Sequence, residues 1–600
     1  MHSATFPRLI CVVALSCGSR GHAAEVLIDQ RTNLVIAAEG SAAEHLSDAT
    51  ELLKKYLPLA LRRATLAGPG PTVRIEVTAL APDWTELSAG ELEGVTDIDR
   101  FEVECKAGTK PEIRITGTYV VSACYGVFDF LERDIGITWL FPGELGVALP
   151  DRAEFRVAAG KRRIRPAIAS RIMTGLRLRK PGIKTSRDPL QQKHRHFLWS
   201  YDYFKSIKLH FMSYASHNMY GLYPPQKYGE TDPDIYPLVD GRRYVPPPRK
   251  KMKEGKPWHP CYTNPKVVDI AEATAKDYFE TRGRHTLSLG INDGRRIQCQ
   301  CEDCTKLGFP EAYYEYVKKV AKRAERYYPP HMLGLIAYGD VGAPPADLRL
   351  PENVFVTISS NRSDHLTVWS KHAQHLGTYE YGYGRGFWVP NFPLKAMVRN
   401  AKLYRDYKVH FLHAEMYPIW PFDGPKMYIR SKLMWNPDLD ADGALQRYCD
   451  AAFGGGGEPM YRYFKRWAAL KDDDIAEEGV SPMTNMRMWR RAGQQFSEVT
   501  PGDYAYCARC VAEAEELVSD VMDRKRLEMF ATFFEHSRAL YAIYRFKERV
   551  FEPDQEQDWL ALLAEAKGLR GRHQQALATI KEHPEWLLGT SQTPDELAAM

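Results

Sequence analysis

Hydrophobic and polar positions follow one rhythm up to about residue 165 and a different one after it. The first part combines short alternating strands with amphipathic helices. The expected strands are 34–36, 73–77 and 113–115, and the expected helices are 41–56 and 120–133. Period-two alternation indicates half-buried strands, whereas spacings of three and four indicate one face of a helix. Residues 25–165 therefore predict a small α+β domain.

From Arg171 onwards, apolar runs alternate with amphipathic helices or long loops. Seven runs are expected to be strands: 172–178, 210–214, 286–292, 332–338, 354–359, 377–382 and 409–415. This alternation over residues 166–436 predicts an α/β fold, a (β/α)8-type barrel, with an open doubly wound sheet as the alternative. No glycine-rich phosphate-binding fingerprint follows a strand, which disfavours the open nucleotide-binding sheet. Residues 437–600 have helical periodicity and predict a helical C-terminal region.

The first residues have the pattern of an export signal. Arg8 precedes the apolar run 9–15, and small residues lead to Ala23 and Ala24. A run this short does not span a bilayer, so we expect residues 1–24 to be a signal peptide and the mature chain to be periplasmic or extracellular. The alternative is a buried strand at the start of a cytosolic domain. The residues before Cys17 resemble a lipoprotein box only faintly, and no later segment is expected to span a membrane.

Composition narrows the classes of function. Hydrophobic residues make up 44% and charged residues 26% of the 600 positions, which is typical of a globular chain with two or three domains. The balance of 81 Lys and Arg against 76 Asp and Glu gives no basis for a nucleic-acid partner. The 33 Tyr and 12 Trp suit clefts that stack against the flat faces of sugars. The sequence leaves the oligomeric state open.

Polar side chains follow several of the expected strands. In a barrel, reactive groups lie where strands end, so these side chains are expected to share one rim. We predict three carboxylates as the catalytic residues: Asp293, Glu380 and Glu415. The residues expected to bind substrate there are His217, Asn218, Asn292, Tyr338, Tyr381, Tyr417 and Trp420.

Paired carboxylates among aromatic rings are what hydrolysis of a glycosidic bond requires. One carboxyl group protonates the leaving oxygen, and the other supplies negative charge near an oxocarbenium-like centre. Each residue also has a structural interpretation taken alone. Asp293 precedes Gly294 in a turn-forming pair, and Glu380 is equally consistent with a surface residue whose stem is packed.

Nine cysteines remain after removal of the expected signal. Cys299, Cys301 and Cys304 lie within six residues of one another, shortly after Asp293. Three sulfurs at this spacing bind zinc if a fourth ligand joins them. For an exported chain we favour a disulfide instead, either local or with Cys261, and we predict no metal and no cofactor.

Four motifs resemble a known family. They are YVVSACYGVFDFLERDIGITWLFPGE (119–144), PCYTNP (260–265), SLGINDG with the cysteine cluster (288–304) and KLMWNPDLD (432–440). In this order they are similar to secreted bacterial proteins of domain-of-unknown-function family 4838, DUF4838. The N-terminal part also resembles the small domain that precedes the barrel in α-glucuronidases and β-hexosaminidases.

Some members of that family are classed as glycoside hydrolase family 163. The resemblance thus implies a (β/α)8 barrel and an endo-β-N-acetylglucosaminidase in which the substrate's acetamido group is the nucleophile. It matches Asp293 to the family's Asn-Asp-Gly motif and Glu415 to a glutamate at a strand end. His413, Ala414 and Met416 depart from the Gly-rich surroundings expected there.

Taken together, these features predict an exported glycoside hydrolase acting on glycans. Glu415 or Glu380 is expected to be the general acid, and Asp293 is expected to orient or stabilise the reacting group. One alternative is a non-catalytic glycan-binding protein on the same scaffold. Another is an α-glucuronidase-like enzyme, which requires a basic residue at the rim to meet the uronate carboxylate.

Overall fold

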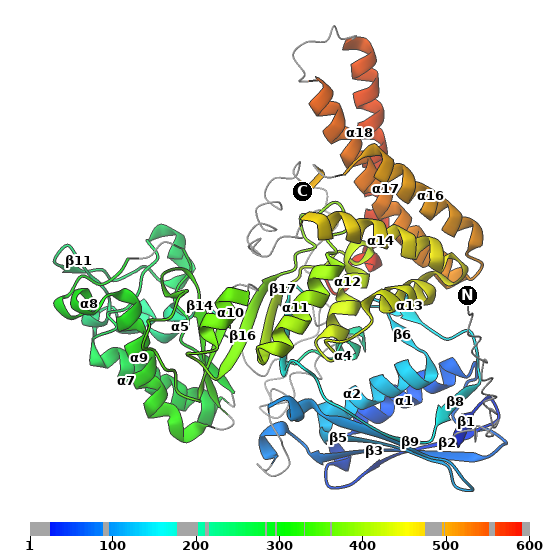
Figure 1. Ribbon diagram of the computed structural model, residues 1–600, viewed down its shortest axis with the longest axis horizontal. Helices are drawn as coiled ribbons and strands as arrows, with labels where there is room; N and C mark the ends of the chain where they lie inside the picture. The colour runs from blue at the N-terminus through cyan, green and yellow to red at the C-terminus, as the bar shows by residue number, and fades with distance from the viewer. Residues whose placement is uncertain are drawn as a thin grey trace, which may run out of the picture.

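The structure is a computed structural model. It describes residues 24–87, 95–176, 202–210, 215–282, 285–294, 297–328, 331–359, 363–474, 495–496, 499–550 and 559–590. Residues 1–23 of the expected signal peptide lie outside the described residues. Three parts are seen in Figure 1: an N-terminal sheet with its helices, a central parallel sheet, and a C-terminal group of helices.

The N-terminal part is a five-stranded mixed sheet with two helices on one face (Figure 1). The strands are β2 (Asn33–Glu39), β3 (Thr72–Ala81), β5 (Glu112–Tyr119), β4 (Phe101–Lys106) and β9 (Gly160–Ile164), in that order. The helices are α1 (Ser47–Ala60) and α2 (Val120–Phe130). In β3, alternate residues from Val73 to Val77 are buried, as period-two alternation predicts. The expected strands and the helix at 120–133 are confirmed, whereas the helix expected at 41–56 begins at Ser47 and ends at Ala60, after a 3-10 turn at Ala43–His45.

The central part is a six-stranded parallel sheet in the order β10-β17-β16-β15-β14-β13. Its strands are β10 (Ser170–Thr174), β13 (Thr286–Ser288), β14 (Met332–Ala337), β15 (Val354–Ile358), β16 (His375–Tyr381) and β17 (Val409–Glu415). Helices α7 (Pro265–Lys276), α9 (Phe309–Ala324), α10 (Ser363–Trp369), α11 (Leu394–Asp406) and α12 (Trp420–Leu433) lie between or after the strands. The first strand pairs with the last, as in a (β/α) barrel.

The described strands form part of a barrel, not a closed (β/α)8 barrel. The expected strand 210–214 begins at His210, which bridges to Arg171 of β10, but residues 211–214 lie outside the described residues. A few residues later, His217 bridges to Gly290, just beyond β13. The bridges of His210 and His217 thus lie at the two opposite edges of the six-stranded sheet.

A buried ion network joins the N-terminal sheet to the first barrel strand. Arg171 of β10 is fully buried and donates through Nη2 to Asp99, which precedes β4. The same carboxylate meets His210 Nδ1 at 2.8 Å and accepts from the Tyr119 hydroxyl at 3.0 Å. The Arg171 guanidinium also donates to the carbonyl oxygens of Ile168, Ala169 and Lys208. Because each charge has a partner, this contact stays buried without an uncompensated ion.

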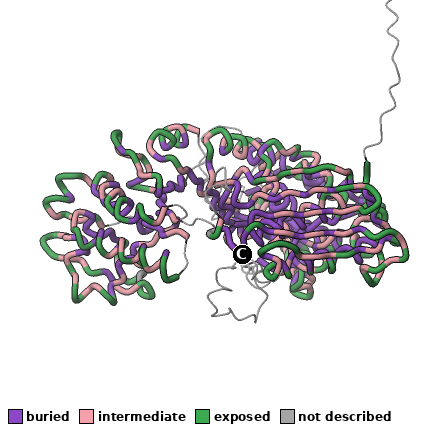
Figure 2. Tube along the Cα trace, turned by 90° about the horizontal axis from the view of Figure 1, so that it is seen from below, coloured by how far each residue is buried: buried purple, intermediate pink, exposed green. Residues whose placement is uncertain are grey.

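The chain ends in helices, as predicted. They are α13 (Ala441–Phe453), α14 (Gly457–Asp474), α16 (Pro501–Leu517), α17 (Val521–Val550) and α18 (Trp559–Glu582). None of the described helices is long and apolar enough to cross a membrane. Figure 2 shows that buried residues concentrate in the interior of the molecule, whereas exposed residues lie along its outer loops.

Candidate functional site

A glutamate at the end of β17 is held by two tyrosines from the end of β16. Glu415 pairs in register with Tyr381, and its carboxylate accepts hydrogen bonds from the hydroxyl groups of Tyr379 and Tyr383. Each carboxylate oxygen has its own phenol, so the group is fixed in position by two charge-assisted hydrogen bonds. Burial raises the pKa of Tyr383, and the hydrogen bond to Glu415 raises it further. Tyr383 therefore acts as a donor and keeps its proton.

Strand alternation explains why these groups meet. Tyr379 and Tyr381 are two residues apart in β16, as are His413 and Glu415 in β17, so all four point to one face of the sheet. The ring of Tyr379 packs on His413 with centroids 4.3 Å apart. Burial lowers the pKa of His413 to about 4, so its ring is neutral at ordinary pH.

Asp293 forms a second cluster beyond β13. The Tyr338 hydroxyl donates to Asp293 Oδ1 at 3.1 Å, and His217 Nε2 lies 4.0 Å from the same oxygen. His217 is oriented through Nδ1, which lies 2.5 Å from the Ile291 carbonyl oxygen. Unlike Glu415, Asp293 is exposed, with 67% of its side chain in solvent.

The charges of both clusters act on Tyr381. Burial raises its pKa to about 12, and the charges of Glu415 and Asp293 both add to this shift, together with Tyr338. Tyr381 pairs in register with Glu415, and its ring lies beside that of Tyr383. That the two carboxylates share one rim stays a prediction.

Three tyrosine rings stand in parallel beside Glu415. Tyr383 stacks on Tyr381 with centroids 6.0 Å apart and planes inclined by 11°, and on Tyr417 at 5.5 Å and 9°. Tyr417 has a left-handed backbone, with φ at 43°. Its ring and backbone lie against Gly175, where a Cβ atom would come within 2.5 Å of them, so only glycine fits there.

A buried ion pair at the start of α12 holds the loop that carries Tyr383. Lys426 Nζ contacts Asp423 at 2.6 Å and donates to the Gly382 carbonyl oxygen at 2.9 Å. Asn391 adds a hydrogen bond to the Tyr383 carbonyl oxygen at 2.9 Å. Burial raises the pKa of Asp423, and Lys426 opposes that effect. These contacts set the position of the tyrosine loop.

Glu380 does not join this site, and the prediction that it shares the rim is wrong. It follows Tyr379 and precedes Tyr381, so it points to the opposite face of the sheet. There it is buried, forms an ion pair with Arg430 of α12 and accepts from the Tyr404 hydroxyl of α11. Burial lowers the pKa of Arg430 to about 10. The alternative interpretation of Glu380 as a surface residue is also wrong.

Three other predicted binding residues are occupied in packing the structure. Trp420 is fully buried, and its indole N–H donates to the Leu588 carbonyl oxygen, so the prediction of a sugar-stacking ring is wrong. Asn292 is buried and donates to the Trp258 carbonyl oxygen at 2.7 Å, and Asn218 donates to the Ser288 carbonyl oxygen at 2.8 Å. Both asparagines hold the turns that present Asp293 and His217.

The predicted disulfide is absent. All nine cysteines of the described residues are free, including Cys261 and the three of the loop after Asp293. The sulfur of Cys261 lies 3.6 Å from that of Cys301 and 3.8 Å from that of Cys304. These four cysteines are the group that could hold a metal ion in the described part of the chain.

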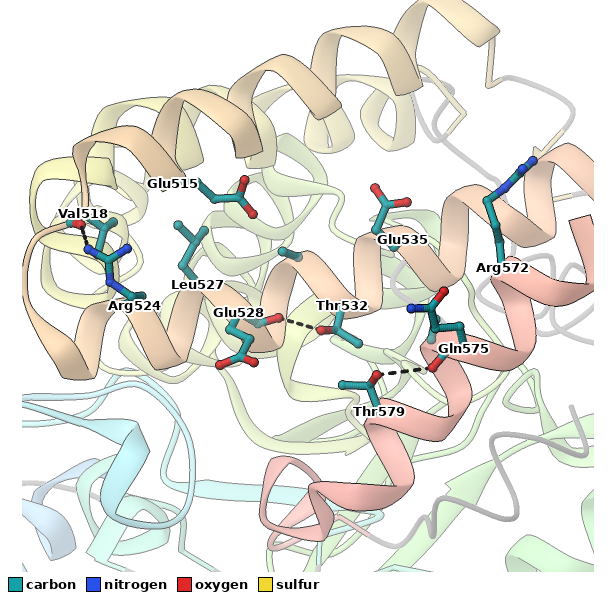
Figure 3. A pocket seen from close by; sticks show the side chains of 12 residues that line it. Glu515, Val518, Arg524, Leu527, Glu528, Thr532, Glu535, Arg572, Gln575 and Thr579 are labelled. Carbon is teal, nitrogen blue, oxygen red and sulfur yellow. Dashed lines mark hydrogen bonds between the residues drawn. The ribbon is translucent and has the colours of Figure 1, made fainter. Parts of the chain in front are cut away.

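A groove of about 640 Å³ lies between α17 and α18, with Glu515 of α16 at its margin (Figure 3). Its lining contains both acidic and basic side chains, such as Glu528, Glu535 and Arg572. None of the predicted site residues lines it. It lacks the carboxylate–tyrosine arrangement found at the strand ends, so we place the candidate site at Glu415 and Asp293.

Sequence reasoning missed Tyr383 and the role of Tyr379 as a donor to Glu415. The signal was present in the sequence, because Tyr379, Tyr381 and Tyr383 are spaced by two and so can follow one face of an extended chain. The hydrogen bonds themselves depend on the pairing of β16 with β17.

Residues 178–465 match the family model described as "Domain of unknown function (DUF4838)". This span contains the described strands from β13 to β17 and both carboxylates of the candidate site. No curated protein sequence is significantly similar to this chain.

The chain is similar to several solved glycoside hydrolase structures. One is described as a GH138 enzyme targeting pectin rhamnogalacturonan II, with 9% identity, 93% of this chain and 75% of that chain covered, and a TM-score of 0.39. Another is CpGH84D, with 10% identity, coverage of 92% and 91%, and a TM-score of 0.39. A family 89 glycoside hydrolase from Clostridium perfringens has 10% identity, coverage of 81% and 62%, and a TM-score of 0.45.

Proposed function

We propose that this protein is a glycoside hydrolase whose reacting groups are Glu415 and Asp293. The observation that carries the proposal is that two strands of the same parallel sheet, β17 and β13, each lead to a carboxylate that accepts from tyrosine hydroxyl groups, Glu415 and Asp293. Glu415 has both oxygens occupied as acceptors from phenols, which suits the negative group beside an oxocarbenium-like centre. Asp293 is open to solvent next to His217, where a leaving group or a water molecule has access.

This proposal changes the roles expected from the sequence. With Glu380 removed from the site, the two-carboxylate chemistry falls to Glu415 and Asp293 alone. Glu415 supplies fixed negative charge, and Asp293 with His217 supplies the proton-transferring side. The parallel rings of Tyr381, Tyr383 and Tyr417 form an aromatic edge against which a sugar face can stack.

We propose a 2-acetamido sugar within a glycan as the substrate, on the basis of the motif resemblance. In a substrate-assisted mechanism the acetamido oxygen attacks the anomeric carbon as the glycosidic C–O bond breaks, and Asp293 protonates the leaving oxygen. Glu415 orients the acetamido group without forming a covalent bond, and water then hydrolyses the cyclic intermediate. We propose further that the parallel sheet belongs to a (β/α)8 barrel and that the chain is exported, as the pattern of residues 1–24 indicates.

The first test is a substrate screen with the purified protein. The panel contains aryl 2-acetamido-glycosides, aryl glucuronides, glycoproteins with complex N-glycans, and plant polysaccharides. Aryl glucuronides are included because Arg385 is a basic residue in the tyrosine loop. Its backbone N–H donates to the Tyr417 carbonyl oxygen, which holds it in that loop.

On the substrate that is cleaved, Glu415→Gln and Asp293→Asn should each lower kcat by at least about a thousandfold, because they remove a group that acts in the transition state. The matched control is Glu528→Gln in the groove between α17 and α18, which should keep the wild-type rate. Thermal melting shows whether each variant is folded.

Full activity in a folded Glu415→Gln protein would refute the proposal. If no member of the panel is cleaved but glycans bind and Tyr381→Ala abolishes that binding, the non-catalytic glycan-binding protein is the correct description. The aromatic edge serves either function, whereas the carboxylate pair serves only the enzyme.

A further inference from the structure

Four cysteine sulfurs meet at one point beside the candidate site. They belong to Cys261, Cys299, Cys301 and Cys304, and all four lie within 4.8 Å of one another. Cys261 and Cys304 are buried, whereas Cys299 and Cys301 are half-buried. Cys261 comes from the turn before α7, and the other three come from the loop after Asp293 and the start of α8 (Glu302–Leu307).

The spacing of the sulfurs is that of a tetrahedral metal site. Zinc binds thiolate sulfur at about 2.3 Å, and the corners of a tetrahedron of that size are about 3.8 Å apart. Cys261 Sγ lies 3.6 Å from Cys301 Sγ and 3.8 Å from Cys304 Sγ. A disulfide needs a sulfur–sulfur distance of about 2.05 Å, and the described cysteines form none.

We propose that Cys261, Cys299, Cys301 and Cys304 bind a structural Zn²⁺ ion. The four ligands fill the coordination sphere and leave no open position, which distinguishes a structural site from a catalytic one. The Cys-x-x-Cys spacing of Cys301 and Cys304 is usual in such sites, and here it spans the first turn of α8.

Neighbouring groups donate to the sulfurs, as expected around thiolate ligands. The Leu238 backbone N–H lies 3.3 Å from Cys299 Sγ, and Arg243 Nη1 lies 3.9 Å from the same sulfur. The Thr263 hydroxyl lies 3.2 Å from Cys304 Sγ. Zinc with four thiolates carries a net charge of −2, which the Arg243 guanidinium partly offsets.

The proposed ion would hold together two segments that support Asp293. The chain around Trp258 pairs with Ile297 through two backbone hydrogen bonds, from Ile297 N to the Pro257 oxygen at 2.8 Å and from His259 N to the Ile297 oxygen at 3.0 Å. Cys261 follows one of these segments and Cys299 follows the other. Zinc thus closes the ladder that anchors the loop after Asp293. The zinc proposal does not depend on the proposed hydrolase activity.

Metal content of the whole chain tests the proposal. The protein purified without chelators should contain about one zinc ion per chain, as measured by inductively coupled plasma mass spectrometry. Cobalt(II) added to metal-free protein should give the visible bands of a tetrahedral site and thiolate charge-transfer absorption in the near ultraviolet. Cys301→Ser replaces a half-buried ligand and should lower zinc content at least about tenfold after dialysis, because one of the four ligands is lost. The matched control, Cys510→Ser in α16, should keep one zinc.

Disulfide mapping supplies the opposing outcome. Alkylation without reduction, in denaturant with a chelator, should label all four thiols. A disulfide between any two of them in the wild-type protein, or zinc-free wild-type protein whose cobalt form lacks thiolate bands, would overturn the proposal. Wild-type zinc content in a folded Cys301→Ser protein would overturn the ligand assignment. The wild-type measurements decide the matter even if the Cys301→Ser protein does not fold.

Discussion

Tyr379 and Tyr383 determine how Glu415 is presented. A half-buried carboxylate without donors would be free to rotate and would lose hydration without compensation. Here each oxygen accepts from a phenol, and burial raises the pKa of the Tyr383 phenol, so the carboxylate is both oriented and solvated by the protein. Tyr383 depends in turn on a loop held by Lys426, which shows that the position of one oxygen atom rests on contacts from three elements.

Removal of the Tyr383 hydroxyl should therefore impair the reaction more than substrate binding. A hydrogen bond to a charged group contributes about 1.5–3 kcal/mol, so Tyr383→Phe should lower kcat by about 10- to 100-fold, with KM changed little. Steady-state kinetics on the substrate found in the screen measure both constants.

Tyr404→Phe is the matched control for that variant. It removes a hydroxyl that donates to Glu380, on the other face of the same strand. It should keep kcat and lower only the melting temperature. Equal loss of kcat in both variants would mean that the effect is one of folding and that Glu415 is not specially positioned.

The elements of the central sheet were predictable because buried parallel strands are continuous apolar runs. All five residues of β15 are buried, and its run was recognised from sequence. Strand β13 ends at Ser288, four residues earlier than expected, because the following chain turns towards Trp258, to which Asn292 donates. The burial of Trp420 was not predictable, since the Leu588 carbonyl oxygen to which it donates lies 168 residues away in sequence.

The placement of Glu380 was predictable in principle. Period-two alternation puts it opposite Tyr379 and Tyr381, whereas the expected rim grouped residues only by their nearness to a strand end. The cluster of four cysteines, in contrast, was not predictable from the sequence. Cys261 was considered as a disulfide partner, but four sulfurs around one point require a fold that brings the turn before α7 onto α8, which spacing along the chain does not reveal.

The contact between β10 and the N-terminal sheet should depend strongly on Asp99. Replacing it with Asn leaves Arg171 buried without a counter-charge, which costs about 3–5 kcal/mol. The Asp99→Asn protein should therefore have a lower free energy of unfolding by that amount in urea denaturation. The control is Asp151→Asn, which breaks an exposed ion pair with Arg62 and should change stability by less than about 1 kcal/mol.

The pH dependence of the same contact has a definite sign. Burial opposes ionisation of Asp99, but the charges of His210 and Arg171 together hold its pKa well below the usual range. The stability that Asp99 contributes is thus complete above about pH 4 and is lost as the pH falls further. A stabilising effect of Asp99→Asn at neutral pH would contradict this account of the interface.

At the scale of the whole molecule, buried histidines should make the protein less stable in mild acid. Burial lowers the pKa of His410 and His413 to about 4, and that of His536 to about 3. Neighbouring charges contribute for two of them, from His375 and Lys408 to His410 and from His573 to His536. These side chains lie in β17 and α17, so the effect involves both the central sheet and the C-terminal helices.

The direction follows from proton binding in the two states. An unfolded histidine has a pKa of about 6.5, so at pH 5 the unfolded chain binds protons that the folded chain excludes. Stability therefore falls as the pH decreases from about 6.5 towards 4, by about 2 kcal/mol for each buried histidine at pH 5. The melting temperature should drop between pH 7 and pH 5, a range in which the depressed carboxyl Asp99 does not yet titrate. His536→Gln should reduce the drop, whereas His45→Gln, at an exposed position, should leave it unchanged. A melting temperature that is constant from pH 7 to pH 5 would show that these imidazoles are solvated in the folded protein. That result would also contradict the packing of His413 on Tyr379 beside Glu415.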